Sequence, residues 1–176
     1  MSDDYFLRTA RLGFRHWTPE DVPLALSLWG DPEVTRLIGG VLSEEKVKAR
    51  LALEISNLAA HGAQYFPAFS LADGQFVGCC GVKPYKLEER IFEFGYALRQ
   101  PYWGRGLAEE ASRAVIPYAV EQTGAPALFA GHHPENAASK HILKKLGFRY
   151  THDELYPLDG LMHPSYWMES RRAPEK

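Results

Sequence analysis

YALRQPYWGRGLAEE, residues 96–110, is the part of the sequence that says most about the fold. Apolar and aromatic residues end a predicted strand, a loop with Gly104 and Gly106 follows, and a helix is predicted to begin at Leu107. The first turn of a helix carries N–H groups without intrahelical partners and the positive end of the helix dipole. Glycines allow a phosphate to approach the backbone closely, and Arg105 adds a positive charge. The segment therefore predicts a pyrophosphate site, although a Gly-x-Gly pair alone fits a plain strand-to-helix turn equally well.

Two other phosphate-binding loops do not fit these residues. The dinucleotide-binding fingerprint needs a third glycine where this chain has Glu109, whose carboxylate would repel phosphates. The other loop needs Gly-Lys followed by Ser or Thr, and the segment lacks both.

Strand and helix patterns continue on both sides of this segment. Ahead of it, aromatic and β-branched runs separated by turn signals predict an antiparallel meander of strands at 65–71, 76–82 and 91–98. The earlier part of the chain predicts a strand at 12–17 and helices at 18–30, 31–34 and 43–61. The later part predicts helices at 107–123 and 136–146 and strands at 128–131, 148–155 and 166–169. We expect one domain over 1–176, an α/β (α+β layered) fold with a mixed sheet flanked by helices.

Composition narrows the class of protein. The chain has 176 residues, with 20 Lys and Arg against 22 Asp and Glu, so its net charge of -2 gives no general attraction to nucleic acid or to an anionic membrane. No run is long enough to span a membrane or forms a signal peptide, so we expect a cytoplasmic protein. The neighbours Cys79 and Cys80 would point to opposite faces of a strand, which predicts small buried fillers without a disulfide.

The loop Trp103–Ala108 resembles the pyrophosphate loop of the GNAT acetyltransferases. That loop reads Gln or Arg, two residues, Gly, one residue, then Gly or Ala, and this chain matches it at Gly106 and Ala108 but has Trp at the first position. Tyr-Trp-Gly before a basic residue and Gly is usual in the branch that contains the ribosomal-protein N-terminal acetyltransferases. Further motifs follow that branch in order along nearly the whole chain: Leu7–Leu12 with Arg15, Asp21, Asp31–Val34, Glu93–Tyr96, Asn136–Ser139 and Leu146–Phe148.

The resemblance implies a GNAT-like, mostly antiparallel sheet and an N-acetyltransferase. Acetyl-CoA would be the co-substrate, and a primary amine would attack its thioester directly, without an acyl-enzyme and without a metal. The backbone of Leu98 and Arg99 would bind the pantetheine arm, with Asn136 beside it and Ser139 near the sulfur. The pyrophosphate would be bound by Trp103, Gly104, Arg105, Gly106, Leu107 and Ala108. Asn136 would serve as a helix cap in either case.

Catalytic roles follow from the same resemblance. The N–H of Leu98 would stabilise the oxyanion, and Glu93 would take the amine proton through water, with Glu154 and His132 as weaker candidates. Glu93 would equally suit a plain strand position paired with an arginine. Many family members place a tyrosine where this chain has Leu143, so Ser139 becomes the candidate acid for the leaving thiolate, although a backbone bond on its own helix would also account for it.

The acceptor amine stays open at this point. It could be a protein N-terminus or a small molecule, and we expect its specificity in the helical segment 31–61 and the loop 153–164, where Glu54, Asp153, Glu154, Tyr156 and Asp159 could receive a cation. His132 and His133 lack a third ligand at a spacing that would hold a metal. A non-catalytic acyl-CoA-binding module is the alternative function, and the chain leaves both a monomer and a homodimer open.

Overall fold

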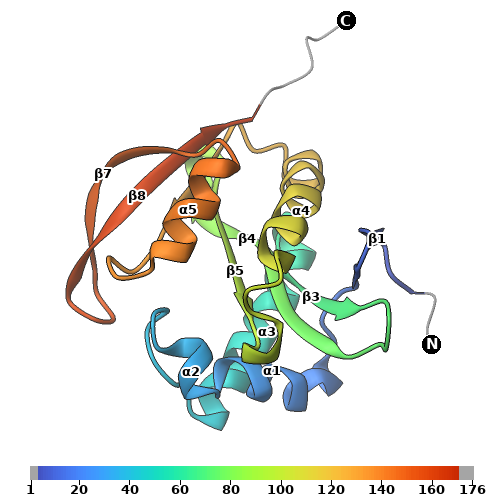
Figure 1. Cartoon of the computed structure of the whole chain (residues 1–176). Helices are drawn as coiled ribbons and strands as arrows, with labels where there is room; N and C mark the ends of the chain where they lie inside the picture. Colours follow the sequence, from blue (N-terminus) through green and yellow to red (C-terminus); the bar gives the residue numbers. More distant parts are fainter. Residues whose placement is uncertain (1–3, 171–176) are drawn as a thin grey trace, which may run out of the picture.

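The computed structural model describes residues 4–170. Within this range the centre is an eight-stranded sheet in the order β1-β2-β3-β4-β5-β6-β8-β7 (Figure 1). Neighbouring strands are antiparallel except β5 and β6, which run parallel. The strands are β1 (Leu7–Arg8), β2 (Leu12–Phe14), β3 (Tyr65–Ser70), β4 (Phe76–Lys86), β5 (Ile91–Leu98), β6 (Ala127–Gly131), β7 (Arg149–Tyr156) and β8 (Leu161–Glu169). The predicted mixed, mostly antiparallel sheet is confirmed.

Helices cover both faces of the sheet and enclose a core on each. They are α1 (Val22–Trp29), α2 (Pro32–Thr35), α3 (Glu44–His61), α4 (Leu107–Thr123) and α5 (Ala137–Lys145). Cys79 belongs to the core under α1 and α3, while its neighbour Cys80 belongs to the core under α4 and α5. Both thiols are fully buried, and burial raises the pKa of Cys79 to about 12. The two cysteines are therefore packing residues on opposite faces, as their adjacency predicted.

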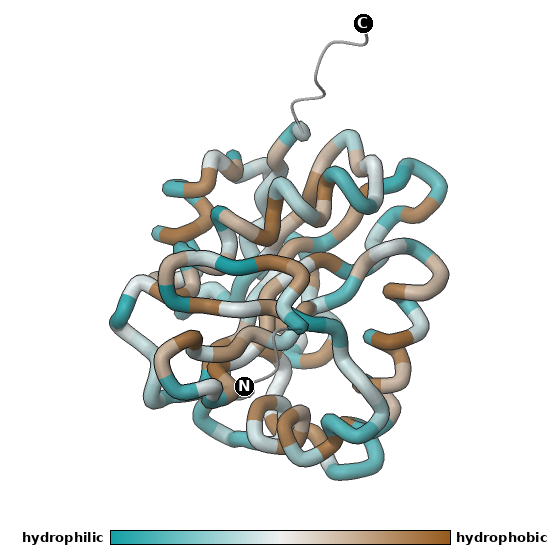
Figure 2. Tube along the Cα trace, turned by 90° about the vertical axis from the view of Figure 1, so that its right-hand side faces the viewer, coloured by the Kyte–Doolittle hydropathy of each residue, from teal (hydrophilic) through white to brown (hydrophobic). Residues whose placement is uncertain are grey.

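Hydropathy follows this layering along the chain. Hydrophobic and hydrophilic residues alternate over short intervals in helices and strands alike (Figure 2). Such alternation is expected when each element turns one side to a core and the other to water. None of the helices in residues 4–170 is long and apolar enough to cross a bilayer.

The predicted elements are present, but several of their ends differ. The strand predicted at 76–82 continues to Lys86, because β4 stays paired with β5 as far as Ile91. The strand predicted at 12–17 stops at Phe14, because the Trp17 N–H bonds the Gln64 side chain (3.0 Å) and so leaves the sheet ladder. The helix predicted from Thr18 begins as a 3-10 turn, with the Thr18 N–H bonded to the Asp21 carboxylate at 2.8 Å. The last strand starts at Leu161, well before 166, because it pairs with β7 along nearly its whole length.

The parallel pair β5 and β6 creates the space for a site. Their register joins Phe92 to Leu128 and Glu93 to Phe129, and among the described residues the pairing goes no further. Beyond Glu93, β5 continues to Leu98 beside β4 alone. The strands therefore part at their carboxyl ends, and α4 and α5 begin beside the opening (Figure 1).

Substitution of Gly81 tests how closely β3 and β4 pack beside this opening. A Cβ at Gly81 would lie 1.9 Å from the Gln64 carbonyl oxygen and 2.8 Å from the Tyr65 Cα. Gly81→Ala would push β3 and β4 apart, and we expect it to lower the free energy of unfolding by about 3 kcal/mol. Urea denaturation measures this loss. Gly131→Ala, whose new methyl group meets nothing closer than 3.5 Å, is the control, and equal stability of the two variants would contradict the expectation.

Candidate active site

A cavity of about 460 Å³ opens where β5 and β6 part. Its lining comes from both sides of the sheet and includes Arg50, Tyr65, Glu93, Tyr96, Asn136 and Ser139. Of these, Glu93, Asn136 and Ser139 are candidates from the sequence. The structure therefore brings the predicted base and the predicted acid to one cavity.

The glycine loop at the start of α4 has the backbone that an anion site needs. Gly104 and Gly106 have φ of +69° and +73°, a conformation that glycine adopts without strain. Gly106 is the residue that precedes the helix, and its carbonyl accepts the Glu110 N–H at 3.1 Å. The N–H groups of Leu107 and Ala108 belong to the first turn and have no carbonyl four residues behind them within the helix. They are positioned to donate to an anion at the helix start.

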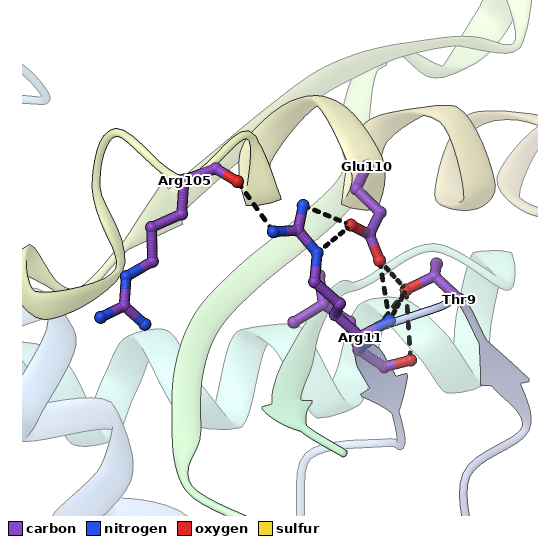
Figure 3. A network of polar contacts seen from close by, with 5 residues as sticks. Thr9, Arg11, Arg105 and Glu110 are labelled. Atoms are coloured by element: carbon purple, nitrogen blue, oxygen red, sulfur yellow. Dashed lines mark hydrogen bonds and ion pairs between the residues drawn. The ribbon is translucent and has the colours of Figure 1, made fainter. Parts of the chain in front are cut away.

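A polar network fixes this loop to the N-terminal strands (Figure 3). The Glu110 carboxylate accepts hydrogen bonds from the Thr9 hydroxyl (2.6 Å), the Arg11 N–H (2.9 Å) and the Arg11 Nε (2.7 Å). The Arg11 Nη1 also donates to the Arg105 carbonyl at 2.9 Å. The Arg105 side chain points away from this network, and its guanidinium lies 5.8 Å from the centre of the Tyr102 ring. The loop is thus held by its backbone while the Arg105 charge faces outward.

The acidic residues of the first turn are paired with cations. Glu109 is bonded to Arg113 at 2.9 Å and to Lys145 at 3.1 Å, and Glu110 to Arg11 at 2.6 Å. These pairs lower the repulsion between the carboxylates and a bound phosphate. The positive end of the helix dipole therefore remains able to attract an anion, despite two acids beside it.

Trp103 holds the loop against β5. Its indole N–H donates to the Leu98 carbonyl at 2.7 Å, and its backbone N–H donates to the Gln100 carbonyl at 3.1 Å. Both of its donors are used inside the protein. Trp103 can therefore contribute to a cofactor only through contact with its half-exposed ring.

The backbone N–H groups of Leu98 and Arg99 point to opposite sides of β5. The Arg99 N–H donates to the Val77 carbonyl on β4 (2.9 Å), and its carbonyl accepts the Tyr102 N–H (3.0 Å). Because successive residues of a strand direct their N–H groups to opposite sides, the Leu98 N–H is directed toward β6. Leu98 thus offers a donor on the open side of β5, whereas Arg99 offers only the second lone pair of its carbonyl.

Asn136, Ser139 and Tyr96 form a chain of hydrogen bonds beside the cavity. The Asn136 Oδ1 accepts the Ser139 N–H at 3.0 Å and caps α5, so the cap expected from the sequence is present. The Ser139 Oγ lies 3.0 Å from the Tyr96 hydroxyl. The alternative backbone bond of Ser139 is not found within residues 4–170. Burial raises the pKa of Tyr96, so its proton stays in place at neutral pH.

Tyr96 is a site residue that the sequence analysis missed. It stands in the Glu93–Tyr96 motif, but its role depends on strand alternation, which places it on the face opposite Glu93. Leu143, at the position where a tyrosine is common, is buried in the core under α4 and α5. A tyrosine hydroxyl thus reaches the site from a strand, at a position that motif spacing did not suggest.

Glu93 pairs with a lysine, not with the arginine expected for a plain strand position. Its carboxylate lies 3.2 Å from the Lys83 Nζ, directly across the ladder from β4. Two residues along the same face, Gly95 leaves room for the Tyr65 hydroxyl, which would lie 2.7 Å from a Cβ there. A carboxylate and a phenol therefore share this side of the opening.

The weaker base candidates are occupied by other groups. The His132 Nδ1 lies 2.7 Å from the His133 carbonyl and must be the protonated nitrogen, so Nε2 accepts from the Tyr166 hydroxyl at 3.3 Å. Burial lowers the pKa of His132, which keeps the ring neutral. Glu154 bonds His152 at 2.8 Å and the Tyr85 hydroxyl at 3.2 Å. Glu93 is the carboxylate with the fewest protein partners at the cavity.

The suggested cation-receiving residues separate into two groups. Glu54 is 1% exposed and bonds both Arg50 and the Tyr65 N–H, so it cannot meet a substrate, and that suggestion is wrong. Tyr156 lines the cavity and stacks on His163 at 4.5 Å. Asp159 bonds His163 at 2.8 Å, and Asp153 bonds the exposed Tyr150 hydroxyl at 3.2 Å. In residues 4–170 no group of three or more His, Cys, Asp or Glu is arranged to hold a metal.

Comparison with known proteins assigns the family. A model of the acetyltransferase (GNAT) domain matches residues 11–149. The chain belongs to the GNAT acetyltransferase family. An uncharacterized N-acetyltransferase, p20 of Bacillus licheniformis, is 30% identical over 145 residues, which are 81% of this chain and 82% of p20. This GNAT protein is therefore an acyltransferase that uses acetyl-CoA.

Solved structures agree with the GNAT fold. An acetyltransferase from Agrobacterium tumefaciens str. C58 superimposes with a TM-score of 0.79 at 23% identity, covering 97% of this chain and 99% of that one. RimL, a ribosomal L7/L12 alpha-N-protein acetyltransferase in complex with coenzyme A, gives a TM-score of 0.78 at 15% identity, covering 92% and 95%. At these identities the likeness concerns the fold alone.

The Glu110 network makes stability depend on pH. Burial opposes the charge of Glu110, but hydrogen bonds from Thr9 and Arg11 lower its pKa below the ordinary 4.5. A lowered folded pKa contributes stability above the ordinary value and loses it as the pH falls through the folded value. We expect Glu110→Gln to cost about 1 kcal/mol near pH 7, and the cost to shrink below about pH 4.5, in urea unfolding across pH.

Glu88→Gln serves as the control, because Glu88 lies exposed in a surface turn. A cost of Glu110→Gln that stays constant from neutral to acid pH would rule out this linkage.

Proposed function

We propose that this GNAT domain, acting as one unit over 1–176, transfers the acetyl group of acetyl-CoA directly to a primary amine, either a protein N-terminus or a small molecule. The observation that carries the proposal is the opening between β5 and β6. Glu93 and the Ser139–Tyr96 pair line the cavity at this opening, and β5 leads from there through the open edge of Leu98 to the glycine loop and the first turn of α4.

Acetyl-CoA binding is assigned to the α4 side of the opening. The N–H groups of Gly106, Leu107 and Ala108 would bind the pyrophosphate, with Gly104 leaving space and Arg105 adding charge. Asn136 keeps its amide nitrogen free of the cap, because the cap uses Oδ1. That nitrogen and the open edge of β5 are the groups we assign to the pantetheine arm, while Trp103 and Arg99 support the loop.

The chemistry requires one bond to form and one to break. The amine nitrogen attacks the thioester carbon, and the Leu98 N–H stabilises the negative charge that develops on the carbonyl oxygen. The carbon–sulfur bond then breaks and CoA leaves as a thiolate. The amine must lose a proton, since amines are largely protonated at neutral pH, and Glu93 takes it through water.

Ser139 supplies the proton that the thiolate needs. A serine hydroxyl alone is a weak acid, but the Tyr96 hydroxyl lies 3.0 Å behind it and can replace its proton. The pair thus performs the role for which many family members use a tyrosine on α5. Tyr96 acts through Ser139 and is a positioning residue in this scheme.

Gly106→Glu tests acetyl-CoA binding. A carboxylate at Gly106 would occupy and repel the phosphate position, so we expect calorimetry to show affinity at least ~10-fold weaker than for the wild type. Gly74→Glu is the matched control, because Gly74 has nearly the same φ, +70°, and lies in the hairpin between β3 and β4. A well-folded wild type that binds no acetyl-CoA would sink the proposal.

Ser139→Ala tests the proton donor. We expect kcat to fall about 100-fold, with a smaller fall for Tyr96→Phe, while the affinity for acetyl-CoA changes little. Steady-state release of CoA thiol with an accepted amine gives kcat, and calorimetry gives the affinity. Ser56→Ala, on the exposed side of α3, should behave as the wild type. Retained acetyl-CoA binding without turnover of any amine would favour the non-catalytic module.

A further inference from the structure

Arg50 is fixed at the end of the cavity that faces α3. Its Nε bonds the Glu54 carboxylate at 2.9 Å, and its guanidinium carbon lies 4.6 Å from the Trp29 ring centre and 5.5 Å from that of Tyr65. Its side chain is 26% exposed, and it lines the cavity. Arg50 is therefore a rigid cation at the cavity wall.

The outer part of the Arg50 guanidinium is unused. Within residues 4–170, no acceptor lies within hydrogen-bond reach of Nη1 or Nη2. Among the described residues no side-chain nitrogen or oxygen is both fully buried and unpartnered, so Nη1 and Nη2 have access to the cavity and are open to a ligand there. Two parallel N–H groups on a planar fork match the two oxygens of a carboxylate.

The Tyr65 hydroxyl is a second donor without a protein partner in the described range. It lies above Gly95, on the face of β5 that carries Glu93. Burial and then Glu93 raise the pKa of Tyr65, whereas Arg50 lowers it, and Arg50 and Glu93 also both act on Tyr156. The two phenols thus lie within the fields of Arg50 and Glu93.

Charge balance at this end favours a neutral zwitterion. Arg50 pairs with Glu54 and Lys83 pairs with Glu93, so these four side chains carry no net charge. Glu154, the other carboxylate of the lining, is bonded to His152 and to the Tyr85 hydroxyl. An amino acid adds no net charge, with its carboxylate at Arg50 and its amine at Glu93. A polyamine would bring several positive charges beside Arg50 and Lys83.

The loop after α2 and the turn between β7 and β8 limit the size of the acceptor. A Cβ at Gly39, in the loop after α2, would lie 3.2 Å from Leu158 in the turn between β7 and β8 and 3.5 Å from the hydroxyl of Tyr156 at the end of β7. Both segments line the cavity, so their contact narrows it on that side. A small molecule fits into such a narrowed cavity more readily than the terminus of a folded protein.

We propose that the acceptor is a small free amino acid whose carboxylate is bound by Nη1 and Nη2 of Arg50 and whose amine faces Glu93. The Tyr65 hydroxyl donates to the same carboxylate. The inference rests on the proposed function and names its acceptor class. The new bond joins the amino nitrogen to the acetyl carbon, the carbon–sulfur bond breaks, the amine proton leaves through Glu93, and CoA takes a proton from Ser139.

Matched sets of acceptors test the carboxylate. L-Alanine, L-leucine, L-methionine and L-phenylalanine are each compared with their carboxamide and with the amine that lacks the carboxyl group. Release of CoA thiol gives kcat/KM, expressed per unprotonated amine because the amine pKa values differ within a set. We expect at least one amino acid to exceed its decarboxylated amine by roughly 10- to 100-fold, and to exceed its amide.

Variants of Arg50 test whether the preference for amino acids depends on this side chain. The double variant Arg50→Gln/Glu54→Gln removes both charges, and the amide oxygen introduced at position 54 can still accept the Tyr65 N–H. It should lower kcat/KM for the amino acid at least ~10-fold more than for the matched amine. Arg50→Lys keeps the positive charge but lacks the two parallel N–H groups, so its preference for the amino acid should lie between those of the wild type and the double variant. Arg36→Gln, at an exposed position beside α2, should leave the preference unchanged. Unfolding temperature and acetyl-CoA affinity show that each variant is folded.

The outcomes separate the two proposals. No acetylation of any amine by an enzyme that binds acetyl-CoA would overturn both. Acetylation of simple amines or of amides at the same efficiency as amino acids would overturn the acceptor class and leave the transferase. A preference for amino acids that survives loss of the Arg50 charge would overturn the role of Arg50.

Discussion

The parting of β5 and β6 is the constraint on which the site depends. Two parallel strands inside a sheet normally satisfy each other's backbone groups along their length. Here the described pairing covers Phe92 and Glu93 only, after which one edge of β5 is left without a neighbouring strand. The structure maintains this break with rigid parts on both sides, a long antiparallel ladder to β4 and the starts of α4 and α5.

Charge compensation is the second organising feature. Several carboxylates lie close to the glycine loop and to the cavity. Each of the four described below has a cation within ion-pair distance. Glu109 and Glu110 are paired at the start of α4, and Glu54 is paired with Arg50 at the cavity wall. Glu93 also has a cation, the Lys83 ammonium at 3.2 Å, but unlike the other three carboxylates it lines the cavity.

Much of the architecture could be predicted from the sequence because its signals are local. Ser43 and Asn136 cap helices where expected, Gly62 and Gly124 end them, and the 96–110 segment forms the predicted strand, loop and helix. What could not be predicted depends on contacts distant in the chain. β1 has two residues and exists only because β2 pairs with it, and Trp17 leaves the sheet because Gln64 offers an acceptor.

The same distinction applies to the site residues. The glycine loop and Asn136 carry motif information, so the sequence pointed to them directly. Tyr96, Tyr65 and Arg50 come from three elements whose faces meet only in the folded sheet, and no spacing in the sequence relates them. Glu54 was misjudged for the converse reason, because a helix position does not reveal that its carboxylate is enclosed by Arg50 and a strand N–H.

The clamp between Glu110 and the turn at Thr9 and Arg11 joins residues about a hundred positions apart. A chain leaving the ribosome exposes that turn long before its partner is made, so the N-terminal strands must wait for two thirds of the protein before they reach their final contacts. Non-local closure of this kind slows folding. The glycine loop, whose Arg105 carbonyl is fixed by the same Arg11, therefore takes its final shape only after α4 has begun to be made.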